Sequence, residues 1–298
     1  MSVVIVTDSA SDIRGDDAVR MNVRVLPMHI RFGTEEYQDG VDLSVHEFYE
    51  KLLESDEIPK TSQITPFDYM TVFEEEAEKG NDVVCITLSS GVSGCYQSAV
   101  NAAEEVNEKG KGHVYVVDSQ QFCISEYILV EEACRLRDQG VSAEKIAEII
   151  TDLRSEAHVI AVFDTLEYLK LGGRISAAAA AAGGLLAIKP VLTITDGVVD
   201  VIGKARGSKK RNNMLNEFAE EKGGVDTELP IVFGYTGFSD YNLKKYIEDN
   251  GSHYGLTDDS KIRIVEVGPT IGTYAGPGAF AAAFFTPQAE EIVKKFIM

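Results

Sequence analysis

Short apolar runs alternate with helical patterns through the first half of the chain. Residues 3–7 and 83–88 are runs of strand length, and residues 114–117 form a shorter one. Such runs are typical of parallel strands that are covered on both faces. Between them, Ser44 and Glu47 have the spacing of a capping box, and Pro66 opens another helical stretch. The alternation predicts a doubly wound α/β domain with a mainly parallel sheet.

The second half has a different pattern of strand-like runs and predicts a mixed sheet. Asp196-Gly197 separates two strand-like runs, which is the strongest short signal for a β-hairpin. Helical stretches near residues 209–221, 240–249 and 288–296 accompany strand-like runs at 159–163, 188–195, 198–202, 231–235 and 262–267. A chain of 298 residues is near the size at which one core divides into two. We therefore predict one α/β domain over residues 1–155 and a second, mixed-sheet α/β domain over residues 156–298.

Charge and composition argue against several classes of protein. The chain has 28 Lys and Arg residues against 48 Asp and Glu residues, a formal net charge of −20. Because nucleic-acid binding depends on cations that neutralise phosphates, no nucleic-acid partner is expected. The N-terminus lacks the pattern of a secretory signal, which predicts a cytoplasmic protein. The Ala- and Gly-rich run at residues 175–188 is shorter than the ~20 residues of a membrane span, so no stable membrane insertion is predicted.

Cysteine and histidine residues show no metal-binding spacing. The four cysteines form no Cys-x-x-Cys motif and are interpreted as small buried hydrophobic residues. The five histidines are scattered along the chain. The sequence therefore predicts neither a metal site nor a cofactor.

The loop at residues 89–94, Ser-Ser-Gly-Val-Ser-Gly, is the best candidate for an anion-binding site. It follows an apolar strand and precedes a helical stretch. In an open α/β sheet, ligands collect at the carboxyl ends of strands, where the N–H groups at a helix start attract anions. The alternative is that these residues only form a turn and a helix cap.

Other polar turns have the same two interpretations. Asp8-Ser9 and Asp118-Ser119 each end a predicted strand and are either ligand groups or helix caps. The hydroxyls at residues 59–63 lie in a predicted connection, which as a loop would face solvent. Residues 268–278 contain five glycines and predict tight turns or a close approach of the backbone to another group. The near matches to a P-loop at residues 197–204 and to a nucleophile elbow at 91–95 both have wrong spacing, so no complete catalytic set is found.

Taken together, these segments resemble the DegV family of bacterial fatty-acid-binding proteins. The resemblance rests on the order and spacing of residues 7–9, 59–63, 89–94, 118–119, 171–175, 188–192, 271–273 and 276–278. It implies a two-domain carrier that holds one long-chain fatty acid in a tunnel between its domains and has no catalytic residues of its own. It further implies that the carboxylate is presented to a separate fatty acid kinase, which makes an acyl phosphate for phospholipid synthesis. The Ala-rich residues 177–182 and the following 183–186 are candidates for leaving room for the acyl chain, or for a tightly packed helix.

The resemblance also implies a set of site residues. Thr61 and Ser93 match the hydroxyls that bind the carboxylate, and Arg174 and Arg206 match arginines near the head group. Tyr274 stands where many family members have His; it can donate a hydrogen bond, but it cannot exchange a proton near neutral pH. The supporting positions come from the flanking loops: Ser62, Gly91, Gly94, Asp8, Ser9, Asp118, Ser119, Gly272 and Thr273.

Two further hypotheses come from other classes of protein. In the first, the protein is an enzyme, a phosphotransferase or hydrolase acting on an anionic small molecule, with Ser93 as nucleophile and Asp118 or Asp8 as its acid/base partner. In the second, it is a lipid sensor whose domains shift when the ligand binds.

Overall fold

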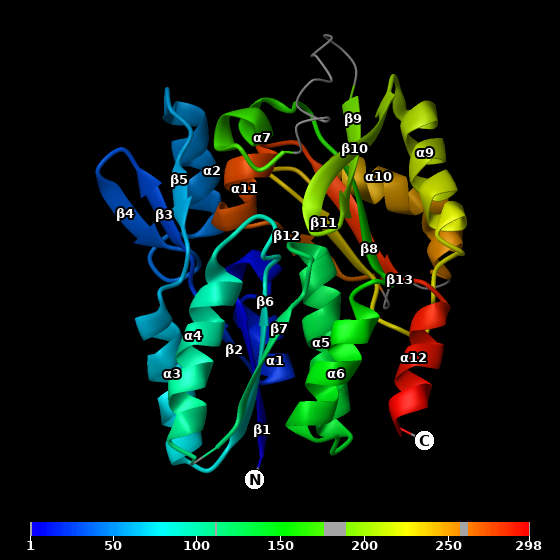
Figure 1. Cartoon of the computed structure of the whole chain (residues 1–298). Helices are drawn as coiled ribbons and strands as arrows, with labels where there is room; N and C mark the ends of the chain where they lie inside the picture. Colours follow the sequence, from blue (N-terminus) through cyan, green and yellow to red (C-terminus); the bar gives the residue numbers. More distant parts are fainter. Residues whose placement is uncertain (1, 111, 176–188, 257–261, 298) are drawn as a thin grey trace.

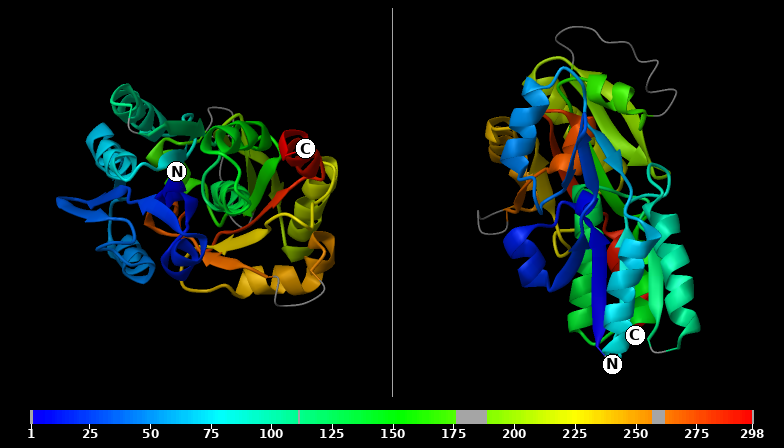
Figure 2. Two further views of the ribbon diagram at one scale, coloured as in Figure 1. Left: turned by 90° about the horizontal axis from the view of Figure 1, so that it is seen from below. Right: turned by 90° about the vertical axis from the view of Figure 1, so that its left-hand side faces the viewer.

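The computed structural model describes residues 2–110, 112–175, 189–256 and 262–297. It has the predicted α/β architecture, with a parallel N-terminal sheet and a mixed C-terminal sheet (Figure 1). Both chain ends lie at the same end of the molecule, away from the C-terminal sheet (Figures 1 and 2). The Ala-rich residues 177–182 and residues 183–186, candidates for a position beside an acyl chain, lie outside the described residues.

The N-terminal sheet has four parallel strands in the order β2-β1-β6-β7. Alternate residues of its strands face opposite sides: Val83 and Cys85 pack with α3 and α4, while Val84 and Ile86 pack with α5 and α6. This two-sided burial explains the continuous apolar runs in the sequence. The elements are β1 (Val3–Asp8), β2 (Val23–Leu26), β6 (Asp82–Thr87), β7 (Val114–Asp118), η1 (Ser9–Ser11), α1 (Gly15–Met21), α3 (Pro66–Glu78), α4 (Cys95–Glu108), α5 (Ile124–Asp138) and α6 (Ala143–Leu153).

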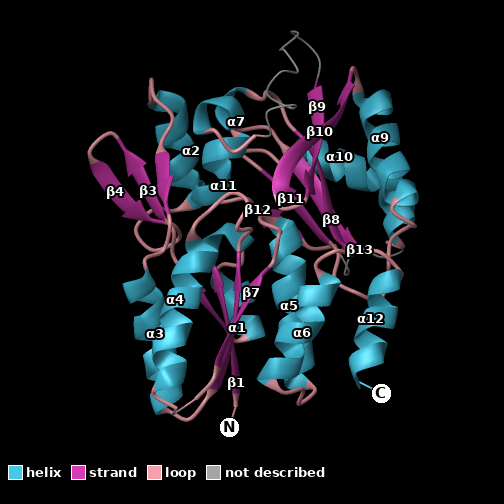
Figure 3. Cartoon of the chain, viewed as in Figure 1, coloured by secondary structure: helices cyan, strands magenta, loops and turns pink. Residues whose placement is uncertain are grey.

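A small antiparallel sheet, in the order β4-β3-β5, lies beside the two larger sheets (Figure 3). It consists of β3 (His29–Phe32), β4 (Glu35–Gln38) and β5 (Lys60–Ser62), and α2 (Val45–Glu54) packs with it. The predicted capping box is present at the start of α2. The prediction of a connection at residues 59–63 is wrong in part, because Lys60–Ser62 is a strand paired with β3.

The C-terminal sheet has six strands in the order β10-β9-β8-β13-β11-β12. The predicted hairpin at Asp196-Gly197 joins β9 and β10, and both turn residues have positive φ angles, 50° and 78°. One face of the sheet packs with α9 and α10 and the other with α5, so α5 lies between the two large sheets. The elements are β8 (Ala157–Val162), β9 (Lys189–Thr195), β10 (Val198–Ala205), β11 (Val232–Tyr235), β12 (Ile264–Glu266), β13 (Phe280–Phe285), α7 (Glu167–Gly172), α9 (Ser208–Glu221), α10 (Tyr241–Asn250), η2 (Gly251–Tyr254), α11 (Pro269–Ala275) and α12 (Gln288–Ile297).

The change from one large sheet to the other falls between β7 and β8, and the domain boundary near residue 155 stays a prediction. In the glycine-rich segment at 268–278, residues 269–275 form the helix α11, and the close approach expected there as an alternative to tight turns is present. Two close approaches account for glycines there. A Cβ at Gly272 would lie 2.7 Å from Phe48 Cε1, and one at Gly276 would overlap the Tyr168 ring.

Candidate functional site

Two adjoining cavities lie between the N-terminal loops, α11 and the C-terminal sheet. The mouth cavity has mixed polar and apolar walls, and the apolar cavity has almost wholly apolar walls. Five residues line both: Phe122, Phe163, Val199, Ile271 and Ala275. The shared lining residues place the two cavities side by side, one with polar groups in its walls and the other almost wholly apolar.

Four of the five residues predicted to bind the head group line the mouth cavity. Thr61 comes from β5, Ser93 from the loop before α4, Arg174 from the segment after α7, and Tyr274 from α11. The fifth, Arg206, lies exposed on the connection between β10 and α9 and does not line either cavity as described. The fold thus brings together four residues that are up to 213 positions apart in the sequence.

Tyr274 is at the centre of this group. Its OH lies 2.5 Å from Thr61 Oγ1, and the Arg174 guanidinium carbon lies 5.3 Å from its ring centroid. Arg174 also donates to the carbonyl oxygen of Gly172 at 2.7 Å. A Cβ at Gly172 would overlap the Tyr274 ring, so glycine is required there to admit it. Because one hydroxyl of the Thr61–Tyr274 pair donates to the other, one proton remains for an acceptor in the mouth.

Ser93, which precedes the N-cap residue Gly94, bonds to the first residue of α4 and also lines the mouth cavity. Its Oγ accepts the N–H of Cys95 at 3.3 Å, at the start of α4. Accepting that bond leaves the hydroxyl proton available to donate into the mouth cavity. The neighbouring Gly94 also lines the cavity. Gln63 packs against Gly94 at the place where a Cβ would lie. The two interpretations of this loop, cap and ligand group, are therefore compatible.

Among the described residues that line the two cavities, none of the other supporting positions is present. Ser62 is exposed on β5, Gly91 packs against the hairpin residue Gly197, and Gly272 and Thr273 face away along α11, where Thr273 donates to Pro269. Asp118 accepts from Ser90, and Ser119 from the N–H of Gln121. Asp8 accepts the N–H groups of Leu88 and Ala10, while Ser9 accepts the N–H of Met28. These polar turns hold loops together.

The apolar cavity has a floor of small residues. Ala161 on β8, Ala281 on β13 and Gly234 on β11 are register partners on adjacent strands, and all three line the cavity. The threonine hydroxyls in its walls are engaged, since Thr193 donates to Val159 O and Thr236 to Ala279 O. Walls that are almost wholly apolar, with the threonine hydroxyls engaged elsewhere, are suited to a hydrocarbon chain.

Several lining residues carried no signal in the sequence. Met28, Phe122, Phe163 and Leu169 line the mouth cavity but resemble ordinary core residues in their local patterns. Gln63 lay within the segment 59–63 but was not singled out; its Nε2 donates to Ser98 Oγ at 2.9 Å. Only the register of the three sheets shows that these side chains converge.

The described residues give no indication of metal chemistry or a membrane span. They contain no cluster of His, Cys, Asp and Glu side chains that could hold an ion, and the four cysteines are buried as free thiols. None of the described helices has both the length and the hydropathy to cross a bilayer.

The fold and the cavities define a class: a two-domain α/β protein with an apolar cavity that adjoins a cavity with polar and apolar walls. The profile of the uncharacterised DegV family matches residues 2–287, and the chain belongs to the DegV family. A DegV domain-containing protein of Caldanaerobacter subterraneus is 36% identical over 286 residues, which cover 95% of this chain and 98% of the relative.

Solved structures agree with this assignment. A DegV family protein from Thermus thermophilus, described by its fatty acid binding, is 31% identical with a TM-score of 0.83, covering 96% of this chain and 100% of the other. A stearic-acid-binding protein from Eubacterium ventriosum is 27% identical with a TM-score of 0.84, covering 98% of this chain and 100% of the other.

Proposed function

We propose that this protein binds one long-chain fatty acid, with the acyl chain in the apolar cavity and the carboxylate in the mouth cavity. The observation that carries the proposal is that two cavities adjoin, one almost wholly apolar and the other lined by Thr61, Ser93, Arg174 and Tyr274. The fatty-acid-binding relatives of the same family support it.

The physical chemistry of a fatty acid fits this arrangement. Burial of ~15 methylenes at about 0.8 kcal/mol each contributes on the order of 12 kcal/mol before the costs of association. A carboxylate moved out of water without partners would cancel much of this gain. Hydroxyl donors and a guanidinium are groups that form strong hydrogen bonds to a carboxylate. The tail thus supplies affinity, and the head group fixes the orientation.

The test is the fatty acid content and affinity of the natively purified protein. Mass spectrometry of organic extracts should find a stoichiometric long-chain fatty acid that is released only from folded protein. Thr61→Ala and Ser93→Ala should each weaken binding by about tenfold, the effect of losing one hydrogen bond to a charged group. Thr71→Ala is the control, because this exposed hydroxyl on α3 only donates to the backbone of its own helix. Unchanged affinity in both mouth variants would refute the head-group assignment.

We further propose that the protein is a carrier that presents the carboxylate to a separate kinase. The competing enzyme hypothesis needs Asp8 or Asp118 beside Ser93, but Asp8 accepts two backbone N–H groups and Asp118 accepts from Ser90. The carrier proposal predicts no ATP turnover by the purified protein alone, and acyl phosphate formation when a fatty acid kinase is added. Arg206, exposed and outside the cavities, is then a candidate contact for that partner. Turnover by the isolated protein, or covalent labelling of Ser93, would favour the enzyme instead.

A further inference from the structure

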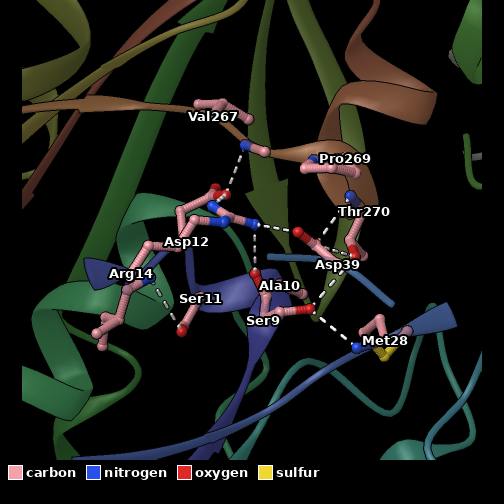
Figure 4. A network of polar contacts seen from close by, with 12 residues as sticks. Ser9, Ala10, Ser11, Asp12, Arg14, Met28, Asp39, Val267, Pro269 and Thr270 are labelled. Atoms are coloured by element: carbon pink, nitrogen blue, oxygen red, sulfur yellow. Dashed lines mark hydrogen bonds and ion pairs between the residues drawn. The ribbon is translucent and has the colours of Figure 1, made fainter. Parts of the chain in front are cut away.

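A network of buried charges joins the N-terminal loop at residues 9–14 to the first turn of α11 (Figure 4). Arg14 donates to Asp12 Oδ1 at 2.6 Å, to Asp39 Oδ1 at 2.8 Å and to the carbonyl oxygen of Ser9 at 3.2 Å. Both carboxylates are buried, and the arginine side chain is only 20% exposed. An arrangement of this kind has a fixed geometry, because the guanidinium fork allows few alternatives.

The two carboxylates that Arg14 binds also hold α11. Asp39 Oδ2 accepts from Thr270 N at 3.1 Å and from Thr270 Oγ1 at 2.5 Å, while Asp12 Oδ1 accepts from Gly268 N at 2.9 Å. The N-cap of α11 is Gly268, which has no side chain to accept these N–H groups. The helix is thus capped by side chains more than 200 residues away in the sequence, and their negative charge matches the positive end of the helix.

The guanidinium of Arg14 and the backbone of α11 are in direct contact. A Cβ at Gly268 would overlap the guanidinium, so glycine is needed there for steric reasons, at an ordinary extended φ of −88°. Ser9 adds a further connection: its Oγ accepts Met28 N at 3.0 Å and lies 3.5 Å from Thr270 Oγ1. Met28 and Thr270 both line the mouth cavity, whereas Arg14 does not line either cavity as described.

The helix that this network holds carries one wall of the binding site. Thr270, Ile271, Tyr274 and Ala275 of α11 line the mouth cavity. A helix of seven residues is too short to be stable alone, so its position depends on the groups around it. We propose that Arg14, acting through Asp12 and Asp39, is a positioning residue for the fatty-acid site: it sets α11 so that Tyr274 meets Thr61 and the ligand carboxylate. This inference rests on the proposed function.

The test compares Arg14→Gln with a matched control, Arg24→Gln. Arg24 also binds two carboxylates, those of Glu75 and Glu76, but these lie on α3 and none of the three residues lines a cavity as described. Affinities for octadecanoic acid and octadecanol are measured on folded protein, with thermal unfolding in parallel. Arg14→Gln should weaken binding of the acid by about tenfold, or about 1.4 kcal/mol, and weaken binding of the alcohol less, whereas Arg24→Gln should change neither.

A double-mutant cycle with Tyr274→Phe separates positioning from a merely structural role. If Arg14 acts through α11, its replacement should weaken acid binding much less in the Tyr274→Phe background than in the wild-type background. Additive effects, or equal losses for acid and alcohol, would overturn the inference. If Arg14→Gln does not fold, two other variants replace it. Arg14→Lys should keep part of the preference for the acid over the alcohol. Gly268→Ala should lose this preference, because the new Cβ displaces the guanidinium. Failure of the wild-type protein to bind the acid would refute the proposed function instead.

Discussion

Two carboxyl groups near the carboxyl end of β1 are fully buried. Asp8 accepts two backbone N–H groups, and burial still raises its pKa from 3.8 to about 7. Glu126 accepts from Thr7 Oγ1 at 3.1 Å, while its other oxygen has no partner. Burial and the neighbouring charge of Asp8 raise the pKa of Glu126 well above its usual value. In the folded protein, these two carboxyl groups therefore hold protons that they release in the unfolded chain.

This proton binding predicts a pH-dependent stability with a definite sign. Since the folded pKa of each group exceeds the unfolded one, both groups stabilise the fold at acidic pH. The contribution of Asp8 is lost as the pH rises from about 4 to about 7, and that of Glu126 is also lost as the pH rises above its unfolded pKa. Glu126→Gln mimics the protonated form and should make the slope of unfolding free energy against pH less negative by up to about 1.4 kcal/mol per pH unit. Denaturant titrations between pH 5 and 8 measure this slope. Glu36→Gln, an exposed control, should leave the curve unchanged, and parallel curves for both variants would contradict the assignment.

At the scale of elements, α11 is placed by its surroundings. Tyr49 OH donates to Val267 O at 2.9 Å just before the helix, and Gly272 in its middle faces Phe48 and Tyr49 of α2. The Asp39 carboxylate caps its start, and Tyr274 near its end packs on Gly172 of α7. Three separate segments therefore fix one short helix, and the site depends on all of them.

Gly272→Ala tests this dependence on packing. In an isolated helix, alanine is more favourable than glycine by about 1 kcal/mol. Here the new Cβ would lie 2.7 Å from Phe48 Cε1 and 2.8 Å from Tyr49 OH, so we expect a loss of about 1–3 kcal/mol of unfolding free energy and weaker fatty acid binding. Chemical denaturation and ligand titration measure the two effects. Gly251→Ala is the control, because its nearest contact would be an ordinary 3.5 Å; equal behaviour of the two variants would argue against a packed α11.

At the scale of the whole molecule, the apolar cavity belongs to no single element. Its floor is the row of Ala161, Ala281 and Gly234 across three strands, and its walls include Phe122 and Ile271 from outside that sheet. The volume available to an acyl chain therefore depends on small side chains in register. Closure of the cavity sets the chain length that fits.

Ala281→Leu should shorten the usable cavity. Each methylene excluded from the cavity costs about 0.8 kcal/mol, so binding of octadecanoic acid should weaken more than binding of dodecanoic acid. Competition titrations with the two acids, and mass spectrometry of copurified acids, measure the change in preference. Ala283→Leu is the control, since Ala283 lies two residues further along β13 and does not line either cavity as described. A chain-length preference that shifts equally in both variants, or in neither, would refute this placement of the acyl chain.

The local part of the fold could be read from the sequence. Apolar runs, capping boxes and the Asp196-Gly197 turn predicted the parallel strands, helix starts and hairpin that the structure has. These features depend on neighbouring residues, so short patterns report them. The helix α5 carried no clear pattern, because eleven of its residues are buried between the two sheets and none of its faces stays polar along its length.

The candidate site, like the fold, has one part that the sequence indicates and another that depends on tertiary contacts. The resemblance implied Thr61, Ser93, Arg174 and Tyr274 as site residues, and their convergence on one cavity depends on strand register and on the position of α11. The motif at Asp8-Ser9 left ligand groups and helix caps as alternatives, and in the structure both residues bind backbone N–H groups, with Asp8 as the N-cap of η1. The sequence by itself determined the elements and the chemistry available at each turn. Only the tertiary structure decided which turns meet, because contacts between residues more than 200 positions apart depend on packing that no local pattern records.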